Sequence, residues 1–225
     1  MLIIIMHSLW YLFINLSIIY MSYPIVDFYL FVKYDKYKQY DRKRKNYIIK
    51  NVMKSHILKY ISVATIPIIP LIIFNICNLT KCIHFLTFLY TSGDTVSLIK
   101  DMNMSSTTKI HHYVTTFLTF IVAFLDWKNP NNIANLMLVY GILSCYSYNV
   151  NKCLGMRFLV WEFQYKELKK NAFMVYSICC TLNWTIHIIY FFYNIKNINL
   201  IMTGYYGIIG LIVYDDIVLL KWLNN

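Results

Sequence analysis

The chain has 225 residues, of which 59% are hydrophobic and only 14% are charged, and its formal net charge is +11. Intrinsic disorder is excluded because it requires low hydrophobicity and many charges. A soluble globular domain is disfavoured because such domains carry roughly 25% charged residues. Six cysteines are too few for a disulfide-rich secreted module. The composition therefore predicts an integral membrane protein.

Apolar stretches long enough to cross a bilayer occur throughout the chain. A hydrocarbon core of about 30 Å requires about 20 mostly apolar residues in a helix. Seven stretches qualify, with approximate ends: 2–32, 57–76, 83–99, 111–125, 133–150, 172–193 and 200–220. Pro24 is expected to kink or end the first. Because helices satisfy their backbone polar groups internally, we expect an all-α membrane protein with about seven spans.

The basic residues are distributed unequally between the two sides predicted by these spans. Eighteen of the 21 Lys and Arg residues fall on one side, ten of them within 33–59. Basic loops remain cytosolic, so we expect a lumenal N-terminus, a cytosolic C-terminus and residence in the endoplasmic reticulum or another endomembrane. The 33–59 segment is predicted to be a cytosolic loop that contacts anionic lipid headgroups. No nucleic-acid recognition motif is present, so no nucleic-acid partner is expected.

Two regions follow from this arrangement. Residues 1–45 are predicted to form an N-terminal transmembrane helix and the basic loop, and residues 46–225 a membrane domain. The first apolar run has no basic leader and no small-residue cleavage site, so we expect it to be retained as a helix. The oligomeric state is not predicted.

Ionisable and polar side chains gather in the cytosolic half of four predicted spans. They are Asp94, His111, His112, Asn149, Arg157, Asp215 and Asp216. A carboxylate in a low dielectric is protonated or paired with a cation, and a short loop joins the spans that carry Asp94 and the two histidines. We therefore expect Asp94 to pair with His111 or His112. The alternatives are a structural cross-link between two helices and, for Asp215 or Asp216, an interfacial residue in contact with water.

Metal binding is not predicted for the histidine pair. Helical metal ligands usually stand three or four residues apart, whereas His111 and His112 are adjacent. There is also no phosphate-cradling glycine loop and no nucleophile elbow in the sequence. We therefore expect no metal and no bound cofactor.

The histidine pair belongs to a recognisable stretch. Residues 90–118 read YTSGDTVSLIKDMNMSSTTKIHHYVTTFL, in which an Asp near a span end and a short loop precede His-His and then Thr115. This pattern resembles the TLC-domain proteins, which include ceramide synthases, the translocating-chain-associating membrane protein and a ceroid-lipofuscinosis protein. Residues 153–159 (CLGMRFL) and 47–55 (YIIKNVMKS) are similar to other parts of the family. The resemblance implies a six-helix barrel or bundle formed by spans two to seven, with a hydrophobic tunnel and an additional first helix.

The resemblance also implies a function. Ceramide synthases follow His-His with an acidic motif in the next span, whereas residues 140–149 (YGILSCYSYN) contain no carboxylate, so the chain resembles the non-synthase members more closely. We expect a protein that binds or handles lipids, with a membrane lipid or acyl chain as its partner. The alternative is a lipid acyltransferase with acyl-CoA as co-substrate. His111 and His112 would then be the general base or nucleophile, and Asp94 would orient one of them. A small transporter and a structural scaffold are further alternatives.

Overall fold

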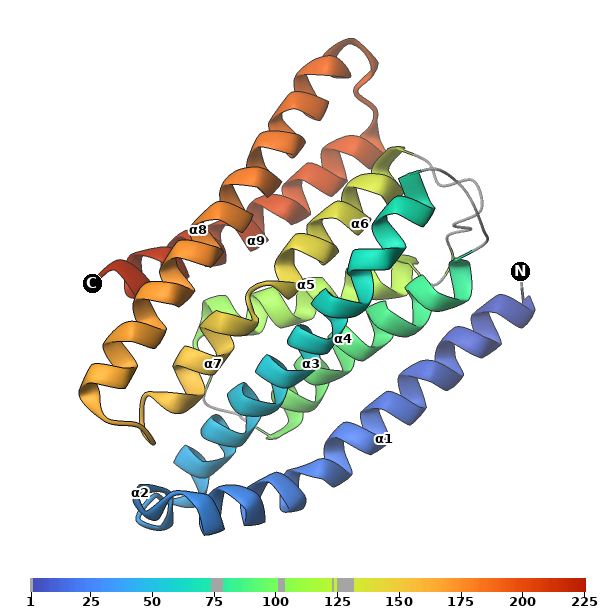
Figure 1. Cartoon of the computed structure of the whole chain (residues 1–225). Coiled ribbons are helices and arrows are strands. Elements are labelled where there is room, and N and C mark those ends of the chain that lie inside the picture. Colours follow the sequence, from blue (N-terminus) through green and yellow to red (C-terminus); the bar gives the residue numbers. More distant parts are fainter. Residues whose placement is uncertain (1, 74–78, 101–103, 123, 125–131) are drawn as a thin grey trace.

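The chain is helical throughout the described residues of the computed structural model, which are 2–73, 79–100, 104–122, 124 and 132–225. These residues contain no β-strand, so the predicted all-α class is confirmed for them. The elements are α1 (Leu2–Lys33), α2 (Asp35–Lys38), α3 (Arg42–Ile73), α4 (Thr80–Lys100), α5 (Ser106–Val122), α6 (Asn132–Cys145), α7 (Tyr148–Met156), α8 (Glu162–Tyr193), the 3-10 turn η1 (Ile195–Asn197) and α9 (Leu200–Asn224) (Figure 1).

Most of the long helices form a closed ring. Around the ring, α3 packs against α4, α4 against α5, α5 against α9, and α9 against α8. The ring closes through α6 and α7, which pack between α8 and α3. Helix α1 lies outside this ring and packs mainly along α4 (Figure 1). The ring therefore encloses the space in which any internal site must lie.

The wall formed by α6 and α7 contains a break. The span predicted over 133–150 lies within the apolar segment Ile133–Met156, inside which α6 ends at Cys145 and α7 begins at Tyr148. The N–H of Ser147 donates to the carbonyl of Ser144 at 3.0 Å, and the N–H of Val150 donates to that of Ser147 at 2.9 Å. Bonds between residues three apart are tighter than α-helical ones, so they interrupt the regular helix.

Close packing of α7 against α3 depends on Gly155. A Cβ atom at this position would lie 3.0 Å from Val52 Cγ2 and 3.2 Å from the Val52 backbone nitrogen. A larger residue would therefore push the two helices apart.

The basic segment 33–59, predicted as a cytosolic loop, is largely helical. Helix α3 begins at Arg42 because the Asp41 carboxylate accepts a hydrogen bond from the Arg44 N–H at 2.8 Å, which caps the helix. Consequently the predicted boundary between residues 45 and 46 falls inside the first turn of α3. Similarly, α1 continues through Pro24 to Lys33. The predicted span ends at 76 and 125 lie outside the described residues.

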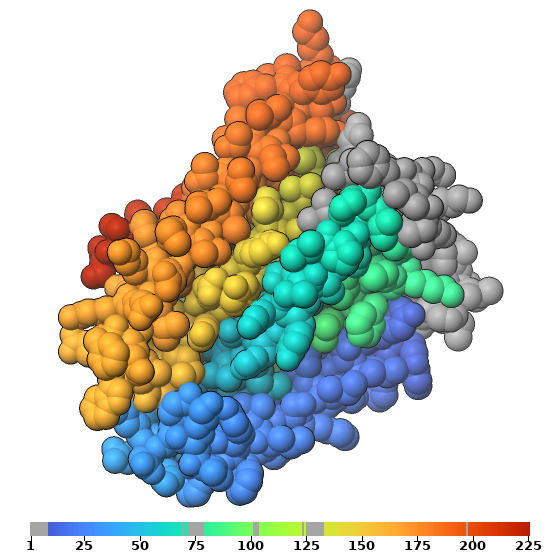
Figure 2. Space-filling model, in the orientation of Figure 1, coloured from blue at the N-terminus to red at the C-terminus, as the bar shows by residue number. Residues whose placement is uncertain are grey.

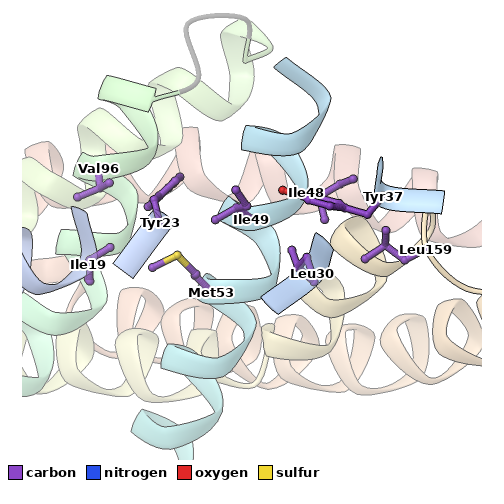
Figure 3. Packing of buried hydrophobic residues seen from close by; sticks show 9 residues of the cluster. All are labelled: Ile19, Tyr23, Leu30, Tyr37, Ile48, Ile49, Met53, Val96 and Leu159. Atoms are coloured by element: carbon purple, nitrogen blue, oxygen red, sulfur yellow. The ribbon is translucent and has the colours of Figure 1, made fainter. Parts of the chain in front are cut away.

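The N-terminal helix shares a hydrophobic core with the ring. Ile19, Tyr23 and Leu30 of α1 are buried against α3 and α4 (Figure 3). The remaining buried members of this cluster are Tyr37, Ile48, Ile49, Met53, Val96 and Leu159. The N-terminal helix is therefore packed onto the rest of the chain through a common core.

Three segments of the described chain are long and apolar enough to cross a membrane. They are Leu9–Lys33, Ile133–Met156 and Glu162–Tyr193. Their outer faces are rich in apolar side chains, such as Ile25 and Phe28, each 70% exposed. Figure 2 shows α8 projecting beyond its neighbours at its C-terminal end. These features are those of a membrane protein.

Candidate functional site

A polar cavity of about 380 Å³ lies inside the ring. Residues of α3, α4, α5, α6, α7, α8 and α9 line it, so its walls come from every helix of the ring. His111, His112, Arg157, Asp215 and Asp216 are among its lining residues. Ligand pockets typically have volumes of about 300–1,000 Å³, so the cavity is large enough for a small polar group.

The first of two acid–imidazole pairs joins α4 and α5. Asp94 is fully buried, and its Oδ1 lies 3.0 Å from Nδ1 of His112. The Thr115 hydroxyl donates to Oδ2 of Asp94 at 3.1 Å. Asp94 thus pairs with the second histidine, across the short connection between α4 and α5.

Lys54 of α3 completes this first pair. Its ammonium group forms an ion pair with Oδ1 of Asp94, and its side chain is only 11% exposed. A buried carboxylate requires a compensating charge, which Lys54 supplies. Asp94 of α4 is therefore held by side chains from two other helices of the ring, α3 and α5.

The second acid–imidazole pair joins α5 and α9. Nδ1 of His111 lies 3.2 Å from Oδ2 of Asp215. The two histidines turn to different carboxylates because adjacent helical residues point about 100° apart. Their rings are perpendicular, with centroids 5.7 Å apart. In both pairs Nδ1 is at contact distance from the carboxylate but is not aligned for a hydrogen bond. Such contacts can tighten when a substrate binds.

Asp216 has a different environment from its neighbour Asp215. The hydroxyls of Tyr140 and Tyr176 each donate to one of its carboxylate oxygens at 2.6 Å. Among the described residues, no basic side chain lies within ion-pair distance of Asp216. Asp215 and Asp216 are both buried, so neither is the water-exposed residue considered as an alternative for one of them.

The other two predicted residues lie on α7 or directly after it. The Nη2 of Arg157 donates to the Tyr47 hydroxyl at 3.3 Å, and its guanidinium stacks over the Phe158 ring at 4.5 Å. Asn149 lies on α7 but does not line the polar cavity, whereas Asn151 does. The structure thus brings six of the seven predicted residues to the cavity or its immediate wall.

A second, apolar cavity of about 130 Å³ adjoins the polar one. Its walls are mostly aliphatic side chains of α3, α4, α5, α6 and α9, such as Ile68, Leu118 and Ile209. Tyr90, His111 and Ser144 line both cavities. His111 therefore stands at the junction between a polar and an apolar space, whereas His112 lines only the polar one.

Sequence reasoning did not identify Lys54, Tyr140 and Tyr176 as site residues. Lys54 was assigned to the lipid-facing basic segment. Its spacing from Tyr47 and Lys50 places the three residues on one helix face, which was the signal available in the sequence. No comparable signal distinguishes Tyr140 and Tyr176 among 21 tyrosines.

Comparison of the chain with protein-family models, with curated proteins and with solved structures finds no match. The resemblance to TLC-domain proteins therefore stays a prediction, and the function must be argued from the geometry of the site.

Proposed function

We propose that this chain is a multi-pass membrane protein that binds or handles a lipid. The polar cavity would hold the head group, and the apolar cavity would hold part of an acyl chain. The observation that carries this proposal is the common wall of the two cavities at Tyr90, His111 and Ser144. A molecule with one polar and one apolar end fits two adjoining spaces of these characters.

In this proposal all of the long helices cross the membrane. The seven spans are α1, α3, α4, α5, the α6–α7 pair, α8 and α9, with spans two to seven forming a TLC-like ring. The bias of basic residues supports a lumenal N-terminus and a cytosolic C-terminus in the endoplasmic reticulum or another endomembrane. Arg42, Lys43 and Arg44 are exposed at the start of α3, where they can contact anionic lipid headgroups.

The proposal is tested by the lipid that co-purifies with the protein. Ser144 is half-buried and lines both cavities, so Ser144→Phe places an aromatic ring at their common wall. Ser177→Phe is the matched control, because Ser177 is also half-buried and lines neither cavity. Mass spectrometry of extracted lipid should show bound lipid in the wild type and the control and a loss of it in Ser144→Phe. Wild-type protein without bound lipid contradicts the proposal.

The second candidate function is a lipid N- or O-acyltransferase that uses acyl-CoA. The two acid–imidazole pairs at the polar cavity favour it, because a carboxylate beside an imidazole makes the ring a stronger base. As a general base, His111 or His112 would take the proton of the lipid hydroxyl or amine while that group attacks the thioester carbonyl, and the C–S bond would break to release the thiol of CoA. As a nucleophile, the imidazole would displace the CoA thiolate and then pass the acyl group to the acceptor lipid, with Asp94 and Asp215 orienting the rings.

Labelled acyl-CoA and a panel of lipid acceptors, incubated with purified protein, test this second candidate. A labelled lipid product that disappears in His111→Ala and His112→Ala would establish transfer. Bound lipid without any product, retained in both variants, would leave lipid binding as the function.

A further inference from the structure

Two hydroxyl groups stand at the common wall of the polar and the apolar cavity. They belong to Tyr90 on α4 and Ser144 on α6, two of the three described residues that line both cavities. Neither hydroxyl forms a hydrogen bond with a described residue. By contrast, the hydroxyls of Tyr140 and Tyr176 both donate to Asp216. The two hydroxyls at the junction are therefore donors that the described protein leaves open to a ligand.

The Tyr90 ring is held in place by its neighbours. The ammonium group of Lys54 lies 5.8 Å from the ring centroid, a distance typical of a cation–π contact. The ring also packs against the hydrophobic cluster that contains Cys145 of α6. Because Ser144 directly precedes Cys145, this packing brings the helix turn that carries Ser144 next to the Tyr90 ring.

Ser144 lies in the last turn of α6, directly before the break in this wall. A serine inside a helix can donate to the carbonyl four residues earlier. The neighbouring thiol of Cys145 does so, to the carbonyl of Gly141 at 3.1 Å. The Ser144 hydroxyl has no such acceptor in the described part of the chain. It is therefore available where the aliphatic wall of one cavity meets the polar wall of the other.

An acyl chain supplies the acceptor that these two hydroxyls lack. A hydroxyl at the edge of an apolar space is costly unless it finds a hydrogen-bond partner. The carbonyl group of an acyl chain stands at the point where the hydrocarbon ends and the polar part of the molecule begins. Its oxygen has two lone pairs and can accept hydrogen bonds from both hydroxyls at once. An alkyl chain joined through an ether has no carbonyl oxygen to offer.

We infer that Tyr90 and Ser144 bind the carbonyl oxygen of an acyl group, so that the protein selects acyl-linked over alkyl-linked chains. The chain lies in the apolar cavity, and the group that carries the acyl chain lies in the polar one. The carbonyl then stands beside His111, the third residue of the junction. An ester of a membrane lipid or an acyl thioester can supply this carbonyl. The inference rests on the proposed function, because it names the chemical class of chain bound at that site.

The first test compares ligands that differ only at the carbonyl. Purified wild-type protein is exchanged against equimolar monopalmitoylglycerol and monohexadecylglycerol, and bound ligand is measured by mass spectrometry. A parallel exchange uses palmitoyl-CoA and S-hexadecyl-CoA. The acyl member of a pair should be retained over the alkyl member by roughly tenfold, the effect of a buried hydrogen bond on an equilibrium. A preference confined to one pair identifies the ester or the thioester as the source, and no preference in either pair would overturn the inference.

Variants at the junction test the assignment to the two hydroxyls. Tyr90→Phe and Ser144→Ala each remove one oxygen, so each should lower the acyl preference while retention of the alkyl ligand stays unchanged. The double variant should retain both ligands about equally. Tyr113→Phe, at an exposed site on α5, and Ser177→Ala, at a half-buried site on α8, are the matched controls, because neither residue lines a cavity. A full acyl preference in the double variant would also overturn the inference.

A spectroscopic measurement needs no variant. A carbonyl that accepts hydrogen bonds absorbs at a lower infrared frequency than a free one, so the isotope-labelled carbonyl of the bound acyl ligand should show the lowered band. A band at the free position contradicts the assignment. Bound lipid without any acyl preference refutes this inference and leaves lipid handling intact. Wild-type protein without co-purified lipid refutes the proposed function itself.

Discussion

Replacing Lys54 with methionine should destabilise the protein, because it leaves the Asp94 carboxylate buried without its ammonium partner. Asp94 is fully buried and the Lys54 side chain is 11% exposed, so water cannot replace the lost charge. Removing one partner of a buried ion pair costs about 3–5 kcal/mol. His112 remains 3.0 Å from Oδ1 of Asp94 and can take up part of the charge, so about 3 kcal/mol is expected. For a chain of this size the unfolding temperature should fall by roughly 10 °C.

A double-mutant cycle tests the reasoning behind this magnitude. Thermal unfolding in detergent should show that Lys54→Met combined with Asp94→Asn is more stable than Lys54→Met alone, because the uncompensated charge is gone. The exposed Lys59 on the same helix provides the control, and Lys59→Met should change stability by less than about 0.5 kcal/mol. The explanation is refuted if Lys54→Met behaves like Lys59→Met, or if the two substitutions at the ion pair are simply additive.

A substitution at Gly155 tests the packing of α7 against α3, and a substitution at Tyr176 tests the hydrogen bonds to Asp216. Gly155→Ala should destabilise the protein by about 1–3 kcal/mol through overpacking against α3, while Gly204→Ala, which has open space, should stabilise it by about 0.5–1 kcal/mol in thermal unfolding. Equal effects of the two would contradict the close approach of α7 to α3. Tyr176→Phe removes one of the two hydrogen-bond donors to Asp216 and should lower the free energy of unfolding by about 1–3 kcal/mol. Tyr193→Phe, at a site 86% exposed, is the control and should leave it unchanged in the same thermal unfolding assay. An unchanged stability of Tyr176→Phe would show that the buried hydrogen bond contributes nothing.

The sequence was sufficient to predict helices and to group the polar residues by depth. Apolar stretches show where a helix can lie in a membrane, and counting residues from the basic ends gives the depth of Asp94, His111 and Asp215. The short connection between α4 and α5 makes the pairing of Asp94 with a histidine a reasonable expectation. These predictions depend only on distance along the chain.

What the sequence could not provide is the rotation of each helix about its axis. In a lipid-facing helix the outer surface is as apolar as the core, so periodicity does not identify the inward face. This is why Lys54 was grouped with exposed basic residues and why Asn149 was chosen where Asn151 lines the cavity. The break between α6 and α7 was missed for a related reason, since no proline or glycine stands at Tyr146 or Ser147.

Because α1 lies outside the ring, it takes part in the packing of the protein but not in the walls of its cavities. No described residue of α1 lines either cavity, and its buried side chains cover the outer surfaces of α3 and α4. Deleting this helix would expose the apolar surfaces of α3 and α4 that it covers, whereas the residues that line the two cavities would all remain. The described part of the N-terminal helix thus contributes to the packing of the ring and not to the lining of either cavity.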